Sequence, residues 1–292
     1  MKSIIIKFVL LILALSVSAP AQKTKTSRKQ LPEQAEKVFH NLNDDAVPLF
    51  VFSYISPWRK VYGSDSPEFV LYQDGSVIFT KCREKDNPYS CYYLMAKLSA
   101  EEISETMEKL RSEEFYSFDA HYSPDTSKVS VTDLTYCLFV MRKPDGTYKK
   151  VSTYGALSGD ETGYVAENVP NALKEIVAFI NSYNSDNSSE FRFEYMEVLL
   201  EPYNGDSKKT INWSKGLPDL NDIKTIKHKN YGRYSLFVHN SLDKRVSDVI
   251  YKLRKAQRNE NEAALFINNR RWKVELRFPF PSEVIWLGKF RD

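Results

Sequence analysis

The feature that most constrains this fold is a pair of short β-rich runs around an Asp-Gly turn. Residues 69–72 (Phe-Val-Leu-Tyr) and 77–80 (Val-Ile-Phe-Thr) flank the turn Gln73-Asp74-Gly75-Ser76. Aromatic and β-branched residues favour strands, and Asp-Gly between two such runs is a strong hairpin signal because both central positions of the turn need positive φ. The sequence therefore predicts an antiparallel hairpin here.

Helix signals follow the hairpin. Ser99-Ala100-Glu101-Glu102 matches a capping box, in which the serine accepts from the amide of Glu102 and the glutamate side chain reaches back. A second helix is predicted after Pro170, and both helices carry apolar residues at helical spacing: Ile103, Met107 and Leu110 in the first, and Leu173, Ile176, Val177 and Ile180 in the second. Strands are predicted over 129–141 and 148–154. The order β-β-β-α-β-β-α indicates an antiparallel sheet with helices packed on one face, an α+β layer.

A polar segment divides the chain. Residues 184–190 (Asn-Ser-Asp-Asn-Ser-Ser-Glu) contain no aromatic residue and have the composition of a linker. After a flexible leader at 22–31, we predict a first domain over 32–183 and a second, smaller domain over 191–292.

The second domain is expected to repeat the same architecture. It opens with an alternating strand over 191–200, contains a helix over 241–255, and closes with two strands around a turn at Asn268-Asn269. The predicted fold class is therefore α+β in two domains, each an antiparallel sheet with helices packed on one face.

The first 21 residues have the pattern of a secretory signal peptide. Lys2 supplies positive charge, residues 8–17 form an apolar run, and Ala19-Pro20-Ala21 places small residues before a cleavage site at Gln22. The run is too short to span a bilayer comfortably, although a retained N-terminal anchor is the alternative. We predict export to the periplasm or the extracellular space, with no transmembrane segment after removal of the signal.

Export bears on the three cysteines, because the exported compartment is oxidising. Cys82 ends one predicted strand and Cys91 begins the next across a polar loop. Opposed residues in an antiparallel pair approach to about 4.5 Å between Cα atoms, which a disulfide can bridge. We therefore predict a Cys82–Cys91 disulfide. Cys137, in an apolar strand, is predicted to be a buried thiol.

The charge is unevenly distributed. Residues 22–190 carry 19 basic and 25 acidic residues, whereas residues 191–292 carry 20 and 13. This asymmetry fits two domains that attract each other, one domain that meets an anionic surface, or solvated faces that differ by chance. Export argues against nucleic acid as a partner. A basic, tyrosine-containing cluster is predicted to be a solvated loop: Lys224, Lys227, His228, Lys229, Tyr231, Arg233 and Tyr234.

Several of these motifs together resemble a known group of proteins. The Asp74-Gly75 hairpin, the helix start at 98–102, the aromatic residues at 115–122, the Thr-rich strand at 131–135 and the Pro170-led helix resemble secreted bacterial proteins carrying an α+β domain of unknown function. That match covers about 69–183. A weaker match over about 213–281 is similar to a second domain of such exported proteins. The resemblance implies no particular activity.

The sequence contains no recognisable catalytic or metal-binding motif. The four histidines lie outside H-E-x-x-H and H-x-H patterns, and no Gly-rich phosphate loop is present. We predict no cofactor and no metal. One tentative binding cleft combines an aromatic wall with polar groups near one end of the first sheet: His121, Tyr122, Asp125 and Asp133. The alternative is that Tyr122 fills the core and Asp125 begins a turn.

The sequence therefore favours a non-catalytic binding or interaction module, whose partner is a protein or a small molecule. Two alternatives stay open: a hydrolase with a dispersed active site, and an inhibitor or stabiliser of another exported protein. A monomer is the default expectation for the oligomeric state.

Overall fold

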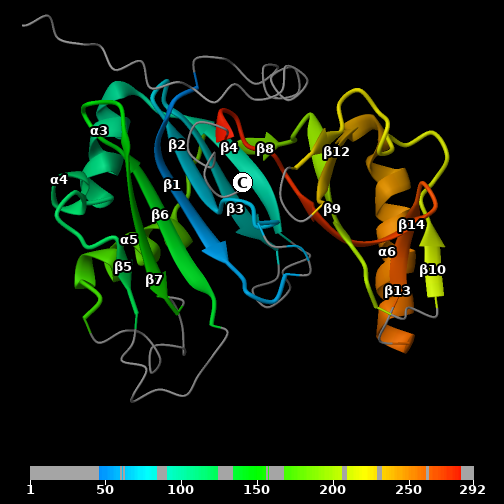
Figure 1. Ribbon diagram of the computed structural model, residues 1–292. Coiled ribbons are helices and arrows are strands. Elements are labelled where there is room, and N and C mark those ends of the chain that lie inside the picture. Colours follow the sequence, from blue (N-terminus) through cyan, green and yellow to red (C-terminus); the bar gives the residue numbers. More distant parts are fainter. Residues whose placement is uncertain are drawn as a thin grey trace, which may run out of the picture. The chain divides into compact units, whose positions relative to one another are not determined.

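The computed structural model describes residues 46–59, 61, 63–83, 91–123, 134–155, 157, 168–205, 209–228, 232–260 and 263–283. All described residues belong to one compact unit, 32–292. That unit contains two β-sheets with helices packed against them (Figure 1). The predicted α+β class is confirmed.

The first sheet contains eight strands in the order β5-β7-β6-β1-β2-β3-β4-β8. The strands are β1 (Pro48–Ile55), β2 (Phe69–Tyr72), β3 (Ser76–Cys82), β4 (Cys91–Lys97), β5 (His121–Tyr122), β6 (Tyr136–Arg142), β7 (Tyr148–Tyr154) and β8 (Ser189–Phe191). All neighbours are antiparallel except β5, which runs parallel to β7. The expectation of a purely antiparallel sheet was wrong at this edge. After β5 the chain enters the sheet one position further in, at β6, and then returns through β7. β7 therefore lies between β6 and β5 and runs parallel to β5.

The Asp-Gly turn joins β2 to β3 as predicted, with a different geometry. Gly75 donates its N–H to the Tyr72 carbonyl at 3.0 Å, and within the turn only Gly75 has positive φ, +85°. A Cβ atom on Gly75 would lie 2.5 Å from the Leu98 carbonyl oxygen, so only glycine fits this position. Asp74 accepts from the Ser76 N–H at 2.9 Å and from Lys97 Nζ at 2.7 Å. The turn therefore also holds the end of β4.

Three helices cover one face of this sheet: α3 (Ala100–Lys109), α4 (Ser112–Phe115) and α5 (Asn171–Ser182) (Figure 1). The predicted capping box is present, since Ser99 N–H donates to Glu102 Oε2 at 2.7 Å and Glu102 N–H donates to Ser99 Oγ at 3.2 Å. The core between helices and sheet includes the predicted face of α5 together with Phe50, Phe52, Phe69, Leu71 and Phe139. Burial of these large side chains is the main stabilising term.

The second sheet contains six strands in the order β10-β13-β14-β9-β12-β11. The strands are β9 (Tyr195–Pro202), β10 (Lys209–Asn212), β11 (Ile226–Lys227), β12 (Tyr234–His239), β13 (Ala263–Ile267) and β14 (Arg270–Arg277). Here β10 runs parallel to β13, so this sheet is also mixed rather than purely antiparallel. The physical reason is that α6 forms the crossover that a parallel pair requires. Asn268 and Asn269 have positive φ, as the tight turn predicted.

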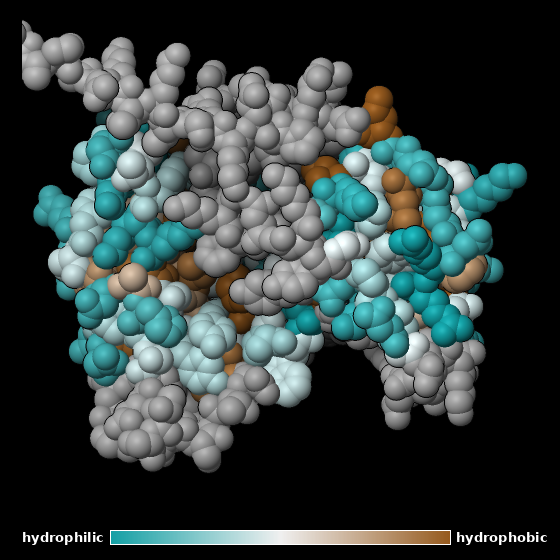
Figure 2. Space-filling view, viewed as in Figure 1, coloured by the Kyte–Doolittle hydropathy of each residue, from teal (hydrophilic) through white to brown (hydrophobic). Residues whose placement is uncertain are grey.

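One helix packs on the second sheet. A 3₁₀ turn, η3 (Asn240–Leu242), leads into α6 (Asp243–Glu260), and the predicted apolar face of α6 is buried: Val246, Val249, Ile250 and Leu253. Most side chains over α6 and β14 in the space-filling view are hydrophilic (Figure 2), and the aromatic side chain of Tyr251 on α6 is 68% exposed. Within the described part of the chain, no helix is both long and apolar enough to cross a membrane.

The predicted linker at 184–190 contributes to the first sheet. Its last two residues belong to β8, in which Ser189 and Glu190 pair with Met95 and Leu94 of β4. Phe193 then joins Phe280 in a cluster on the sheet face opposite the helices, beside Val70 and Ile78. Both faces of the first sheet are therefore covered. The division into two independently folding domains stays a prediction.

Candidate binding cavity

A cavity of about 630 Å³ borders both sheets. Residues of β3, β4 and the β1–β2 connection line it on one side, and residues of α6 and β14 line it on the other. Pockets of roughly 300–1,000 Å³ are the size that holds small ligands or short segments. Among the cavity residues, Cys91 had been predicted as half of a disulfide, and Ile250 and Leu253 as part of a buried helix face, but none as a binding residue.

Arg59 is anchored at the cavity by a buried carboxylate. Its Nε donates to Asp65 Oδ1 at 3.1 Å, and the Ser56 N–H donates to the same oxygen at 3.2 Å. Burial raises the pKa of Asp65, against the opposing effects of Ser56 and Arg59. Among the described residues, the printed hydrogen bond of Arg59 uses only its Nε, and its guanidinium lies on the cavity lining.

Glu68 lies next to this pair. Its backbone extends the β2 ladder, because Glu68 N–H donates to the Phe52 carbonyl and Thr80 N–H donates to the Glu68 carbonyl, each at 2.9 Å. Burial raises the pKa of the Glu68 carboxyl, and the nearby positive charge of Arg59 opposes that rise. Burial, followed by the Glu68 charge, raises the pKa of Tyr93. This wall therefore presents a carboxyl, a guanidinium and a phenol together.

Ser64 adds an unsatisfied group to the same wall. Its side chain is 1% exposed, and its Oγ has no hydrogen-bond partner among the described residues. Buried hydroxyls normally have a partner, since leaving one unpaired costs about 1–3 kcal/mol.

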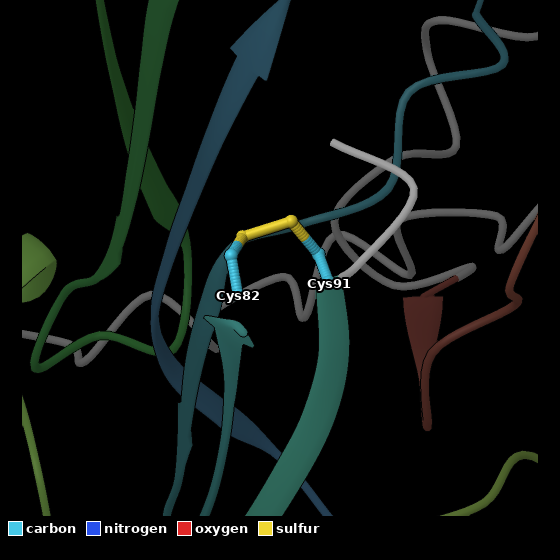
Figure 3. Close-up of a disulfide and its surroundings, with 2 residues drawn as sticks. All are labelled: Cys82 and Cys91. Atoms are coloured by element: carbon cyan, nitrogen blue, oxygen red, sulfur yellow. A yellow bond between two sulfur atoms is a disulfide. The ribbon is translucent and has the colours of Figure 1, made fainter. Parts of the chain in front are cut away.

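The predicted disulfide joins Cys82 and Cys91 across β3 and β4 (Figure 3). The two residues are directly paired in the register of these strands, as the hairpin reasoning required. Cys91 lines the cavity two residues before Tyr93, so the disulfide fixes the strand that carries Tyr93. Cys137 keeps its thiol and is fully buried in β6, with Sγ 3.7 Å from the Gly155 carbonyl.

A buried ionic cluster lies beside the cavity. Arg277 is 1% exposed and binds Glu197 at 3.1 Å through Nη1 and Glu283 through Nη2. Glu283 also accepts from the Phe280 N–H at 3.1 Å. These contacts connect β9, β14 and the segment after β14. Because every charge has an opposite charge in contact, we assign the cluster a structural role.

The cleft predicted from the sequence is only partly described. His121 and Tyr122 are the two residues of β5. His121 is exposed, with Nδ1 2.9 Å from Ser152 Oγ, whereas Tyr122 is buried in the core and its hydroxyl accepts from the Asp119 N–H at 2.9 Å. Asp125 and Asp133 lie outside the described residues, so the cleft stays a prediction. Tyr122 itself is a core residue, which was the stated alternative.

Three members of the basic cluster have polar partners among the described residues. Arg233 pairs with Glu201 at 2.6 Å, and His228 Nε2 lies 2.7 Å from Ser235 Oγ. Lys224 donates to the Tyr195 hydroxyl at 2.9 Å. Lys229 and Tyr231 lie outside the described residues. In the part of the chain that the structure covers, no group of three or more His, Cys, Asp or Glu residues is placed to hold a metal ion.

Comparison with protein-family models, curated proteins and solved structures gives no match to this chain. The cavity is therefore interpreted from its own chemistry. Sequence reasoning missed Arg59, Ser64 and Glu68 because they follow one another in an irregular connection without a motif, and only the fold brings them opposite α6 and β14.

Proposed function

We propose that this protein is an exported binding protein that holds its ligand in the cavity between β3–β4 and α6–β14. The observation that carries the proposal is the Arg59 guanidinium and the Glu68 carboxyl together on the lining of one cavity. Strands and a helix carry most of the lining. Groups held on rigid elements bind without a large ordering cost.

Export is part of the same proposal. It is supported by the apolar N-terminal run and by the Cys82–Cys91 disulfide, since disulfides persist in oxidising compartments. We also propose that the chain belongs to a secreted bacterial family with two domains, 32–183 and 191–292, each built mainly on one of the two sheets, with β8 linking them through its pairing with β4. In that arrangement the cavity lies along the domain junction, which is a preferred location for ligand sites.

A hydrolase is the second candidate function, and one observation favours it. A carboxyl group whose pKa is raised by burial, in a cavity beside a guanidinium, has the properties of a general acid. A Glu68→Gln variant distinguishes the binding hypothesis from the hydrolase hypothesis. A binding protein would turn over no substrate in either form, whereas a hydrolase would lose turnover of any substrate that the wild type cleaves.

The direct test uses full-length protein recovered from the exported fraction. Native mass spectrometry would detect a co-purified ligand, and thermal denaturation would measure stabilisation by added compounds, which binding to the folded state produces. We expect Arg59→Gln to reduce the stabilisation, while Arg192→Gln, at a side chain that is 78% exposed, leaves it unchanged. Failure of every compound and extract fraction to stabilise the wild type would contradict the proposal.

A further inference from the structure

The cavity lining carries opposite charges on both of its walls. Arg59 and Glu68 lie on one wall. Arg254 of α6 and Glu275 of β14 lie on the other. Arg277 also lines the cavity, but its charge is compensated within the buried ionic cluster. The remaining charges balance, so a ligand with a net charge would leave one sign of the lining without a counter-charge. The lining therefore favours a ligand that has no net charge.

Arg59 and Glu68 are two separate charged groups rather than one ion pair. Within the described part of the chain, Arg59 forms its ion pair with Asp65, through Nε at 3.1 Å, and not with Glu68. The two groups are nevertheless close, because burial raises the pKa of Glu68 and the positive charge of Arg59 opposes that rise. This wall therefore presents a guanidinium and a carboxyl that lie near each other without contact between their charged ends.

A ligand that covers these two groups displaces water from them. A charge removed from water is stable only beside an opposite charge or a good hydrogen-bond partner. The guanidinium of Arg59 has N–H donors beyond Nε, in a planar fork that matches a carboxylate. The carboxylate of Glu68 is stabilised most by a cation, and a sugar would offer it hydroxyl groups but no positive charge. The pair therefore matches a ligand that carries both a carboxylate and an ammonium.

Aromatic surface adjoins this charged pair. Tyr93 and Phe278 both line the cavity and are partly buried. Their ring centroids are 5.9 Å apart in an edge-to-face arrangement. Tyr93 is close to Glu68, since the Glu68 charge adds to the effect of burial in raising the pKa of Tyr93. From α6, Ile250 and Leu253 add aliphatic lining. The cavity therefore combines a charged pair with apolar surface beside it.

We propose that the cavity binds a free α-amino acid with an apolar side chain, placing its carboxylate at Arg59, its ammonium at Glu68 and its side chain against Tyr93 and Phe278. This inference rests on the proposed binding function and names the class of ligand. An α-amino acid carries both charged groups on one carbon, so one small molecule reaches two protein groups that lie close together. The cavity volume of about 630 Å³ is sufficient for a large side chain.

The test uses full-length protein recovered from the exported fraction and isothermal titration calorimetry. The probes are L-leucine, L-isoleucine, L-methionine and L-phenylalanine. The amino acid that binds most tightly is then compared with its deaminated analogue, which lacks the ammonium, and its decarboxylated analogue, which lacks the carboxylate. Neither analogue adds bulk. We expect each to bind the wild type about tenfold or more weakly than the amino acid, as loss of a charge-assisted hydrogen bond predicts.

Two variants assign each charge of the ligand to its partner. In Glu68→Gln, the deaminated analogue should bind within about threefold of the amino acid, because the ammonium has lost its counter-charge. In Arg59→Gln, the decarboxylated analogue should bind within about threefold of the amino acid, for the corresponding reason. Glu190→Gln and Arg192→Gln are the matched controls, since these residues form an exposed ion pair and are not part of the cavity lining. Both controls should discriminate against the analogues as the wild type does.

Denaturation curves establish whether each variant is folded, and the analogue series on the wild type decides the question if a variant is not. Failure of all the amino acids to bind would overturn the inference. Equal binding of either analogue and its amino acid by the wild type would do so too, as would a folded cavity variant that keeps the full discrimination.

The binding function itself stands in these cases if another compound stabilises the wild type and Arg59→Gln weakens that effect. Absence of stabilisation by any amino acid or other compound would reject the binding function as well.

Discussion

The two sheets differ in what covers their second face. The first sheet buries apolar side chains on both faces, with helices on one and the cluster around Phe193 and Phe280 on the other. The second sheet packs α6 on one face and places buried and partly buried ion pairs among its other residues, including Glu197–Arg277 and Glu201–Arg233. An apolar core tolerates small changes in side-chain shape, whereas a buried charge is stable only with its partner in place.

The largest effect is expected at the buried ionic cluster. Replacing Arg277 by Met leaves Glu197 and Glu283 buried without their cation, which should lower the free energy of unfolding by about 3–5 kcal/mol. Urea denaturation measures the change. Arg233→Met, at a pair that is about 20% exposed, is the control and should cost about 1 kcal/mol or less. Equal losses of unfolding free energy at the two sites would contradict the expectation that the buried pair matters more than the partly exposed one.

The next effect concerns the first sheet. Replacing Cys82 and Cys91 together by Ser should lower the free energy of unfolding by about 2–3 kcal/mol, because the disulfide closes a short loop in the unfolded chain. Cys137→Ser, in β6 of the same sheet, is the control for a buried cysteine outside the disulfide. Peptide mapping under non-reducing conditions checks the pairing, and a crosslink that includes Cys137 would contradict the β3–β4 register.

A smaller effect is expected where the first sheet meets α3. Ser99→Ala removes the acceptor for the Glu102 N–H and should cost about 1 kcal/mol. Ser112→Ala is a useful comparison, since Ser112 lies within α4 rather than at a capping position. A Ser99→Ala variant as stable as the wild type would show that packing, rather than the cap, determines where α3 begins.

The smallest effect is expected in how the free energy of unfolding depends on pH. Burial raises the pKa of Glu68 in the folded protein above its ordinary value of 4.5. The folded state then binds more protons than the unfolded state, so this group makes stability fall as pH rises from about 4.5 through the raised value. Glu68→Gln should remove that contribution. Unfolding measured from pH 4 to 8 checks it, and parallel wild-type and variant curves would argue against the raised pKa.

Local features of the fold follow from local sequence. The Ser99 capping box, the apolar faces of α5 and α6, the Asn268-Asn269 turn and the opposed Cys82 and Cys91 each depend on residues close together in the chain. Hydrophobic periodicity and turn chemistry are short-range signals, so one sequence is sufficient to detect them. The α+β class follows from the order of these elements.

Long-range pairing was decided only by the tertiary structure. The sequence does not indicate that β5 lies parallel to β7 or that β8 continues the first sheet from β4, because strand partners distant in the chain leave no periodic trace. The cavity depends on the same kind of contact. Glu68 and Arg59 acquire a facing wall only when α6 and β14 pack opposite them. Local chemistry thus determined the elements of this protein, and long-range packing decided which groups face one another.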